Sequence, residues 1–210
     1  MNSKGLISIF FGFFSFHKKL IINLLVLPIL SFTTKYETYP LPSFISNSLN
    51  LIISVKTNIE CFKCEYAAKM NDTIRASANN ESKNYKLLSG NYLIPVKLID
   101  CHNKLMNNDL QNLLNVSKFP HIQIKIKNLS ISKNSGNLGK GSFIVIIDGI
   151  NKEYVAFYKN YFKENILVID GNLSIDLSDF NISPPSKFFG LVKVDKILDV
   201  NFGLKLKLNN

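Results

Sequence analysis

From Asn47 to the end of the chain, apolar residues tend to recur at every second position, and this alternation constrains the fold more than any other feature. Leu49, Leu51, Ile53 and Val55 fall on one side of a segment. The cleanest case is 121–131, where isoleucines alternate with polar residues. Successive residues of a strand point to opposite faces of a sheet, so the pattern predicts strands with one buried face.

The alternation predicts about eight strands and one helix. Strands are expected at 49–55, 61–68, 90–98, 121–131, 141–148, 153–159, 166–177 and 192–208. Pro95 indicates that the strand at 90–98 lies at an edge or contains a bulge. The strand at 192–208 should contain a break or bulge near 195–199. Apolar residues at helical spacing predict a helix over 103–115, whereas 71–86 is polar and weakly patterned.

This set of elements predicts an all-β fold. About eight antiparallel strands can close into a barrel whose interior holds side chains or one small ligand. We therefore expect a closed antiparallel barrel with one short helix. A β-sandwich has the same local pattern, and periodicity alone does not distinguish the two.

The first 32 residues differ from the rest of the chain. Two apolar stretches, 6–16 and 20–32, flank His17, Lys18 and Lys19. A charged pair before an apolar run of this length is typical of an export signal, and an uncleaved membrane anchor is the alternative. We expect a signal or anchor over 1–32, a linker over 33–46, the barrel over 47–210, and a periplasmic or other extracytoplasmic location.

The formal net charge of +10 does not indicate a nucleic-acid surface. The lysines are scattered along strands, where each alternates with an apolar residue, as at Lys125 and Lys127. A nucleic-acid site needs a concentrated basic patch with aromatic platforms or a known module. Weak, transient contact with anionic membrane surfaces is consistent with this charge.

Several local motifs follow one another in a specific order. The Pro95-Val96-Lys97 segment, Cys101 and Met106 precede the helix, then come Lys118-Phe119-Pro120 and Gly149-Ile150-Asn151-Lys152. The C-terminal part adds 179–182, Pro184-Pro185, Phe189-Gly190 and 192–194. Over 47–208 this order resembles the YceI-like family. The resemblance implies an exported, lipocalin-like barrel that takes polyisoprenoid or similar amphiphilic chains, without catalytic residues.

A cavity for a lipid chain needs a continuous apolar wall, which the inward positions of alternating strands supply. The candidate lining residues are Phe62, Tyr66, Ile122, Ile124, Ile126, Phe143, Val145, Ile147, Leu173, Ile175 and Leu177. The alternative is that these side chains fill a solid core. For any single position that alternative is the commoner case.

Three cysteines supply the sharpest competing ideas. Cys61, Cys64, Cys101 and His102 have the side-chain types of a zinc site. On a strand, however, Cys61 and Cys64 point to opposite faces, which opposes both metal binding and a redox Cys-x-x-Cys pair. We expect no metal, and we predict a structural disulfide between Cys64 and Cys101.

Together these features favour a non-enzymatic protein that carries or buffers an isoprenoid-like or other lipid chain and needs no further cofactor. A solidly packed barrel that binds a protein partner is the second hypothesis. A small hydrolase or isomerase ranks last, because His102 and His121 have no nucleophile or carboxylate at a recognisable catalytic spacing. The oligomeric state is not encoded in any of these patterns.

Overall fold

The computed structural model describes residues 43–79, 84–132, 136, 138–184, 186–187 and 191–209. These residues belong to one compact unit that begins at Pro40. The predicted signal or anchor over 1–32 lies outside the described residues, as does most of the predicted linker.

The described residues form an antiparallel sheet of eleven strands with one α-helix and two short 3-10 helices. Its elements are β1 (Ser43–Thr57), β2 (Cys61–Lys69), β3 (Thr73–Asn79), β4 (Asn84–Leu87), β5 (Asn91–Pro95), η1 (Val96–Leu98), α2 (Lys104–Leu113), β6 (His121–Ser132), β7 (Leu138–Ile147), β8 (Ile150–Lys163), β9 (Ile166–Asp176), η2 (Leu177–Phe180), β10 (Ser186–Lys187) and β11 (Val192–Asn209).

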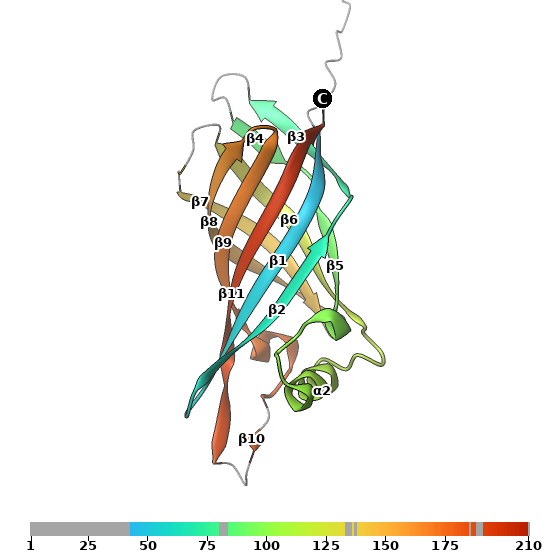
Figure 1. Ribbon diagram of the computed structural model, residues 1–210, viewed down its shortest axis with the longest axis vertical. Coiled ribbons are helices and arrows are strands. Elements are labelled where there is room, and N and C mark those ends of the chain that lie inside the picture. Colours follow the sequence, from blue (N-terminus) through green and yellow to red (C-terminus); the bar gives the residue numbers. More distant parts are fainter. Residues whose placement is uncertain are drawn as a thin grey trace, which may run out of the picture. The chain divides into compact units, whose positions relative to one another are not determined.

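The sheet closes on itself. The strands follow the order β11-β9-β8-β7-β6-β4-β3-β1, and β1 then pairs with β11, from Ser43 opposite Asn209 to Thr57 opposite Val194 (Figure 1). A closed ring of strands excludes the sandwich. The predicted all-β antiparallel barrel is therefore confirmed.

The barrel begins earlier than predicted. Pro40 and Pro42 suggested a linker up to residue 46, but β1 begins at Ser43, directly after the second proline. Phe44 and Ser46 are both completely buried. A register shift between Ser46 and Ser48 interrupts the alternation here, which hid the inward direction of Phe44 from a strict period of two.

The segment 71–86, to which no strand was assigned, contributes β3 and β4. Their inward residues are Ile74, Ala76, Tyr85 and Leu87, and the positions between them are polar. Alanine and tyrosine weaken the apolar signal, and both strands are short. They nevertheless join β6 to β1 and so complete the ring.

Two predicted irregularities are present. β5, which ends at Pro95, pairs only with β6 among the described strands. In β11, Leu198 lies opposite Val55 but Val194 lies opposite Thr57, which marks a bulge between them. A further register shift between Ile126 and Asn128 of β6 turns Leu129 and Ile131 into the interior.

The helix α2 is fixed at its start by side-chain capping. The Asn103 side chain accepts hydrogen bonds from the backbone N–H groups of Leu105, at 2.9 Å, and Met106, at 3.3 Å. The backbone N–H of Cys101 donates to Asn107 at 2.7 Å. These contacts hold α2 at the end of the barrel where the β1–β2 hairpin and β10 also lie (Figure 1).

Candidate functional site: an apolar cavity inside the barrel

The inward side chains of the barrel leave open space at one end. The larger cavity has a volume of about 480 Å³, and a smaller one of about 50 Å³ lies next to it. Leu51, Ile124, Val145, Ile175 and Val200 line both, so the two spaces are neighbours inside the barrel. A volume near 480 Å³ lies in the range of pockets that hold small organic ligands.

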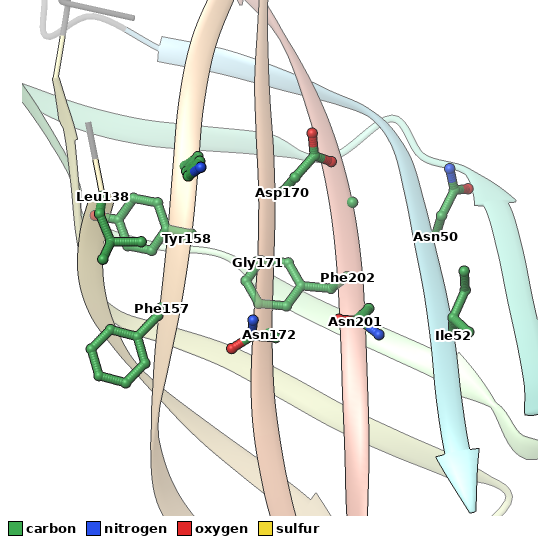
Figure 2. Close-up of a pocket in the computed structure, with 12 residues that line it drawn as sticks. Asn50, Ile52, Leu138, Phe157, Tyr158, Asp170, Gly171, Asn172, Asn201 and Phe202 are labelled. Atoms are coloured by element: carbon green, nitrogen blue, oxygen red, sulfur yellow. The ribbon is translucent and has the colours of Figure 1, made fainter. Parts of the chain in front are cut away.

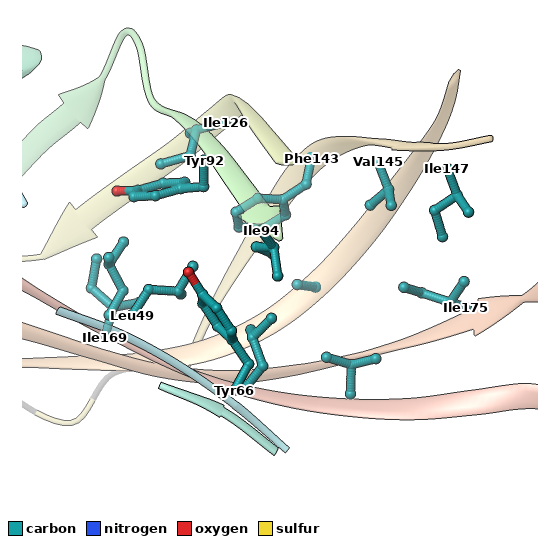
Figure 3. Packing of buried hydrophobic residues seen from close by; sticks show 14 of the residues in the cluster. Leu49, Tyr66, Tyr92, Ile94, Ile126, Phe143, Val145, Ile147, Ile169 and Ile175 are labelled. Atoms are coloured by element: carbon teal, nitrogen blue, oxygen red, sulfur yellow. The ribbon is translucent and has the colours of Figure 1, made fainter. Parts of the chain in front are cut away.

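The predicted lining residues lie where the hypothesis requires them, with one exception. Phe62, Ile122, Ile124, Val145, Ile147, Ile175 and Leu177 line the larger cavity, and Ile126, Phe143 and Leu173 line the smaller one. Figure 3 shows several of these side chains directed into the barrel. Tyr66 is buried in the core but belongs to neither lining. That these residues bind lipid stays a prediction.

The sequence reasoning did not identify the residues that form the mouth of the larger cavity. Three segments supply them: the β1–β2 hairpin, the helix α2 and the start of β11. They are Thr57, Ile59, Glu60, Met106, Asp109, Leu110, Leu113, Leu114, Val192 and Val194. The apolar spacing of 103–115 predicted the helix, but its position over the barrel end depends on contacts far apart in the sequence.

A second group was visible in the sequence but was not assigned to the cavity. Leu51, Ile53 and Val55 of β1, and Leu198 and Val200 of β11, also line the larger cavity. Alternation had already placed Leu51, Ile53 and Val55 on one strand face. What was missed is that β1 and β11, which pair to close the ring, direct their inner faces into the same space.

The barrel wall has a seam between β2 and β5. Among the described residues no strand ladder joins them, and the wall is held there by one isolated bridge beside a disulfide. The Glu65 N–H donates to the Asp100 carbonyl at 2.8 Å, and the Asp100 N–H donates to the Glu65 carbonyl at 2.9 Å. We call this bridge and the adjacent disulfide the seam.

The disulfide joins Cys64 of β2 to Cys101, which is the pairing expected from the sequence. Both residues are buried and both line the larger cavity. Cys61 is a free thiol on the exposed face of β2. Because two of the three thiols are joined and the third points outward, the strand geometry does not bring the three sulfurs around one ion.

Polar groups near the seam stay on the outside. The His102 ring, with its side chain 63% exposed, lies 3.8 Å from a Glu65 carboxylate oxygen and 3.7 Å from one of Asp100. A hydrogen bond from Asn107 lowers the pKa of the Asp100 carboxyl. His121 is exposed at the start of β6. Among the described residues no three His, Cys, Asp or Glu side chains gather as metal ligands would.

The other end of the barrel is packed with side chains. The Tyr158 hydroxyl donates to the Ser130 carbonyl, and the buried Asn160 side chain donates to the Ser132 carbonyl at 2.7 Å. The ring of Tyr158 fills the space beside Gly139 and Gly141, where a Cβ atom would collide with neighbouring atoms. Phe44, Ile74, Leu87, Ile131 and Leu167 are buried there, and none of them lines either cavity.

Two tyrosines between the cavity and the packed end are strongly buried. Burial raises the pKa of Tyr92 to about 12, while the nearby Ser46 hydroxyl acts in the opposite direction. Neither of these two hydroxyls reaches hydrogen-bond geometry with any partner among the described residues. Burial also raises the pKa of Tyr66. This stretch of the barrel therefore tolerates neutral phenol groups and opposes charge.

A depression of about 480 Å³ also lies on the outer wall, across β8, β9, β11 and β1 (Figure 2). Its lining includes Gly171 and Gly203, and its rim includes Asn50, Asn172 and Asn201. These amides are exposed to solvent. Because the depression is open and edged by polar groups, it lacks the enclosed apolar surface that a lipid chain requires.

No helix among the described residues has the length and apolar character needed to cross a bilayer. In sequence comparisons, no protein-family model and no curated protein match the chain.

Solved structures do match the fold. A polyisoprenoid binding domain from Saccharophagus degradans, implicated in plant cell wall breakdown, aligns with a TM-score of 0.50 and 10% identity over 81% of this chain and 100% of that chain. BcnA of Burkholderia cenocepacia aligns with a TM-score of 0.53 and 13% identity over 75% of this chain and 95% of that chain. A mutant CJ YceI protein aligns with a TM-score of 0.43 and 16% identity.

At these identities the first two matches bear on the fold alone. They cover 100% and 95% of the solved chains. The barrel therefore shares its fold with the polyisoprenoid binding domain and with BcnA, and the predicted YceI-like fold is confirmed.

Proposed function

We propose that the protein binds a polyisoprenoid or similar amphiphilic lipid by burying its tail in the barrel cavity. The observation that carries the proposal is the space of about 480 Å³ enclosed mainly by aliphatic side chains. About ten buried methylenes would contribute about 8 kcal/mol, which corresponds to a micromolar dissociation constant before ordering costs are subtracted. Apolar burial of this kind needs no bond chemistry and no further cofactor.

The cavity of about 480 Å³ disfavours the alternative of a solidly packed interaction module, because a volume of this size is typical of ligand sites. The polar lining residues Thr57, Glu60 and Asp109 belong to the segments at the mouth, where an amphiphile's head group would reach water. The name of the polyisoprenoid binding domain, which has the same fold, agrees with this class of ligand.

We further propose that the protein works outside the cytoplasm. A disulfide in a barrel wall is typical of proteins in oxidising compartments. The apolar N-terminal sequence with Lys18 and Lys19 supports export, either by a cleaved signal or as an anchored protein.

The test is binding by delipidated protein, measured by native mass spectrometry and by titration with an isoprenoid alcohol, a quinone and a fatty acid. Val145 lines both cavities, so Val145→Phe should fill space and weaken binding at least about tenfold. Val155→Phe, on the exposed face of β8, is the matched control and should bind like the unmodified protein.

Protein that binds none of the three lipids would contradict the proposal. An occluded Val145→Phe variant that binds as well as the control would also contradict it, because the ligand would then lie elsewhere. Thermal unfolding of both variants shows whether each is folded before its binding is compared.

A further inference from the structure

Large aliphatic side chains protrude into solvent around the mouth of the cavity. Ile59 is 68% exposed, Leu98 62%, Leu105 74% and Leu191 73%. We call these four residues the mouth rim. Of the described large apolar residues, only Leu138, at 68%, is comparably exposed, and it lies at the start of β7, away from the mouth.

The mouth rim lies on segments that also line the cavity. Ile59 itself lines the larger cavity. Leu98, Leu105 and Leu191 each precede a lining residue, namely Ile99, Met106 and Val192.

Hydrogen bonds hold part of the mouth rim in place. The Asn58 side chain donates to the Leu191 carbonyl at 2.8 Å, and the Lys193 N–H donates to the Asn58 side chain at 2.8 Å. They tie the β1–β2 hairpin to the start of β11. Ile59 and Leu191 are thus held together before binding, so docking should cost little conformational entropy in these segments.

Exposed charges of both signs flank the mouth rim. Lys63, Lys97, Lys104 and Lys193 are exposed, and so are Glu60 and Asp195 in the same segments. This mixture favours neither sign of charge on a partner surface. Separate aliphatic tips suit a bilayer interface, where each tip enters apolar surroundings without needing a complementary pocket.

We propose that the mouth rim docks on a lipid bilayer, so that the cavity opens directly toward the acyl-chain region. A lipid then passes between bilayer and barrel without exposing its tail to water. This inference rests on the proposed lipid-binding function and adds the partner surface and the residues that contact it.

The test uses the full chain and its single free thiol. Cys61 is exposed at the start of β2, two residues beyond Ile59, and accepts an environment-sensitive fluorophore. The comparison protein carries the same fluorophore at residue 138, through Leu138→Cys in a Cys61→Ser background. Each is mixed with phosphatidylcholine vesicles with and without phosphatidylglycerol, and spin-labelled lipid is added as a quencher.

We expect a blue shift and quenching for the label at Cys61 with both kinds of vesicle, and neither for the label at residue 138. Any contribution of the N-terminal sequence is common to both proteins. Equal signals at the two positions, or no signal at Cys61, would overturn the docking proposal.

Substitutions separate docking from ligand binding. The double variant Leu105→Ser with Leu191→Ser should lower vesicle affinity about tenfold or more, while Leu138→Ser, the matched control, should leave it unchanged. Both should bind soluble ligand in vesicle-free solution like the parent. Unchanged vesicle affinity in the double variant overturns docking. Loss of ligand binding in all proteins, with vesicle binding intact, overturns the proposed function instead.

Discussion

The two ends of the barrel use the same backbone pattern to opposite effect. At the packed end, the Tyr158 ring lies against Gly139 and Gly141. At the mouth end, Ile122, Val145 and Ile175 face a common space. A large ring on one strand fills the space left by glycines on its neighbour. Medium-sized aliphatic side chains on opposite walls do not reach one another, so space remains between them.

The comparison teaches that close packing and open volume are separated along the barrel. The packed end has buried hydrogen bonds and close contacts, and it closes the ring through β3 and β4. The mouth end gives up close packing, and each unfilled volume costs the contacts that its lining would otherwise make. The seam supplies covalent support where those contacts are missing.

The largest effect should come from removing the seam disulfide. Replacing Cys64 and Cys101 with alanine frees a loop with a sequence separation of 37 and should lower the free energy of unfolding by about 4 kcal/mol. Urea unfolding measures the loss. Hydrogen exchange should show that the amides of Glu65 and Asp100 lose protection while those of the packed end keep theirs.

Cys61→Ser is the matched control for that experiment, because its thiol is exposed and free. We expect no change in its unfolding midpoint. A uniform loss of protection across the whole barrel of the double variant would mean that the two ends do not differ in the way described.

A pair of isoleucine truncations should give the next largest effect. Ile169 is completely buried and lines neither cavity, so Ile169→Ala should cost about 3 kcal/mol. Ile122 already borders open space, so Ile122→Ala should cost about 1 kcal/mol. Urea unfolding of both variants gives the comparison, and equal losses would contradict the existence of the space.

The smallest effect at neutral pH should come from two tyrosine-to-phenylalanine changes. The Tyr158 hydroxyl donates to the Ser130 carbonyl, so Tyr158→Phe should cost about 1 kcal/mol. The Tyr92 hydroxyl has no hydrogen-bond partner among the described residues, so Tyr92→Phe should be neutral or slightly stabilising. Unfolding at pH 7 checks both.

Alkaline titration sharpens the result for Tyr92. Burial raises its pKa to about 12, so the unfolded chain loses this proton first, and the stability of the folded protein falls as the pH rises from about 10 toward 12. Tyr92→Phe should reduce this alkaline loss by about 2 kcal/mol. An unchanged pH profile would show that the hydroxyl is not buried.

Much of this fold is predictable from the sequence, because period two is a local property. Ile122, Ile124 and Ile126 alternate with polar residues and so indicated their inner face directly, whereas 143–147 is apolar at every position. β3 and β4 were not predicted because their inward residues include Ala76 and Tyr85, which carry little apolar contrast. Phe44 was missed because the β1 bulge breaks the count.

The cavity itself is not predictable from alternation. Ile124 and Leu167 are both inward aliphatic residues on long strands, yet one borders open space and the other is completely buried. The difference depends on what lies across the barrel, which ring closure and helix placement decide together. The sequence could predict which residues face inward, but it could not predict where the space between them stays open.

The seam makes the rigidity of the barrel wall depend on the oxidation state of Cys64 and Cys101. Where a neighbouring strand would contribute a row of backbone contacts, this wall has one bridge and one sulfur–sulfur bond. The barrel should therefore be more rigid in an oxidising compartment than in a reducing one. Under the proposed function, it should hold a ligand tightly only after the disulfide has formed.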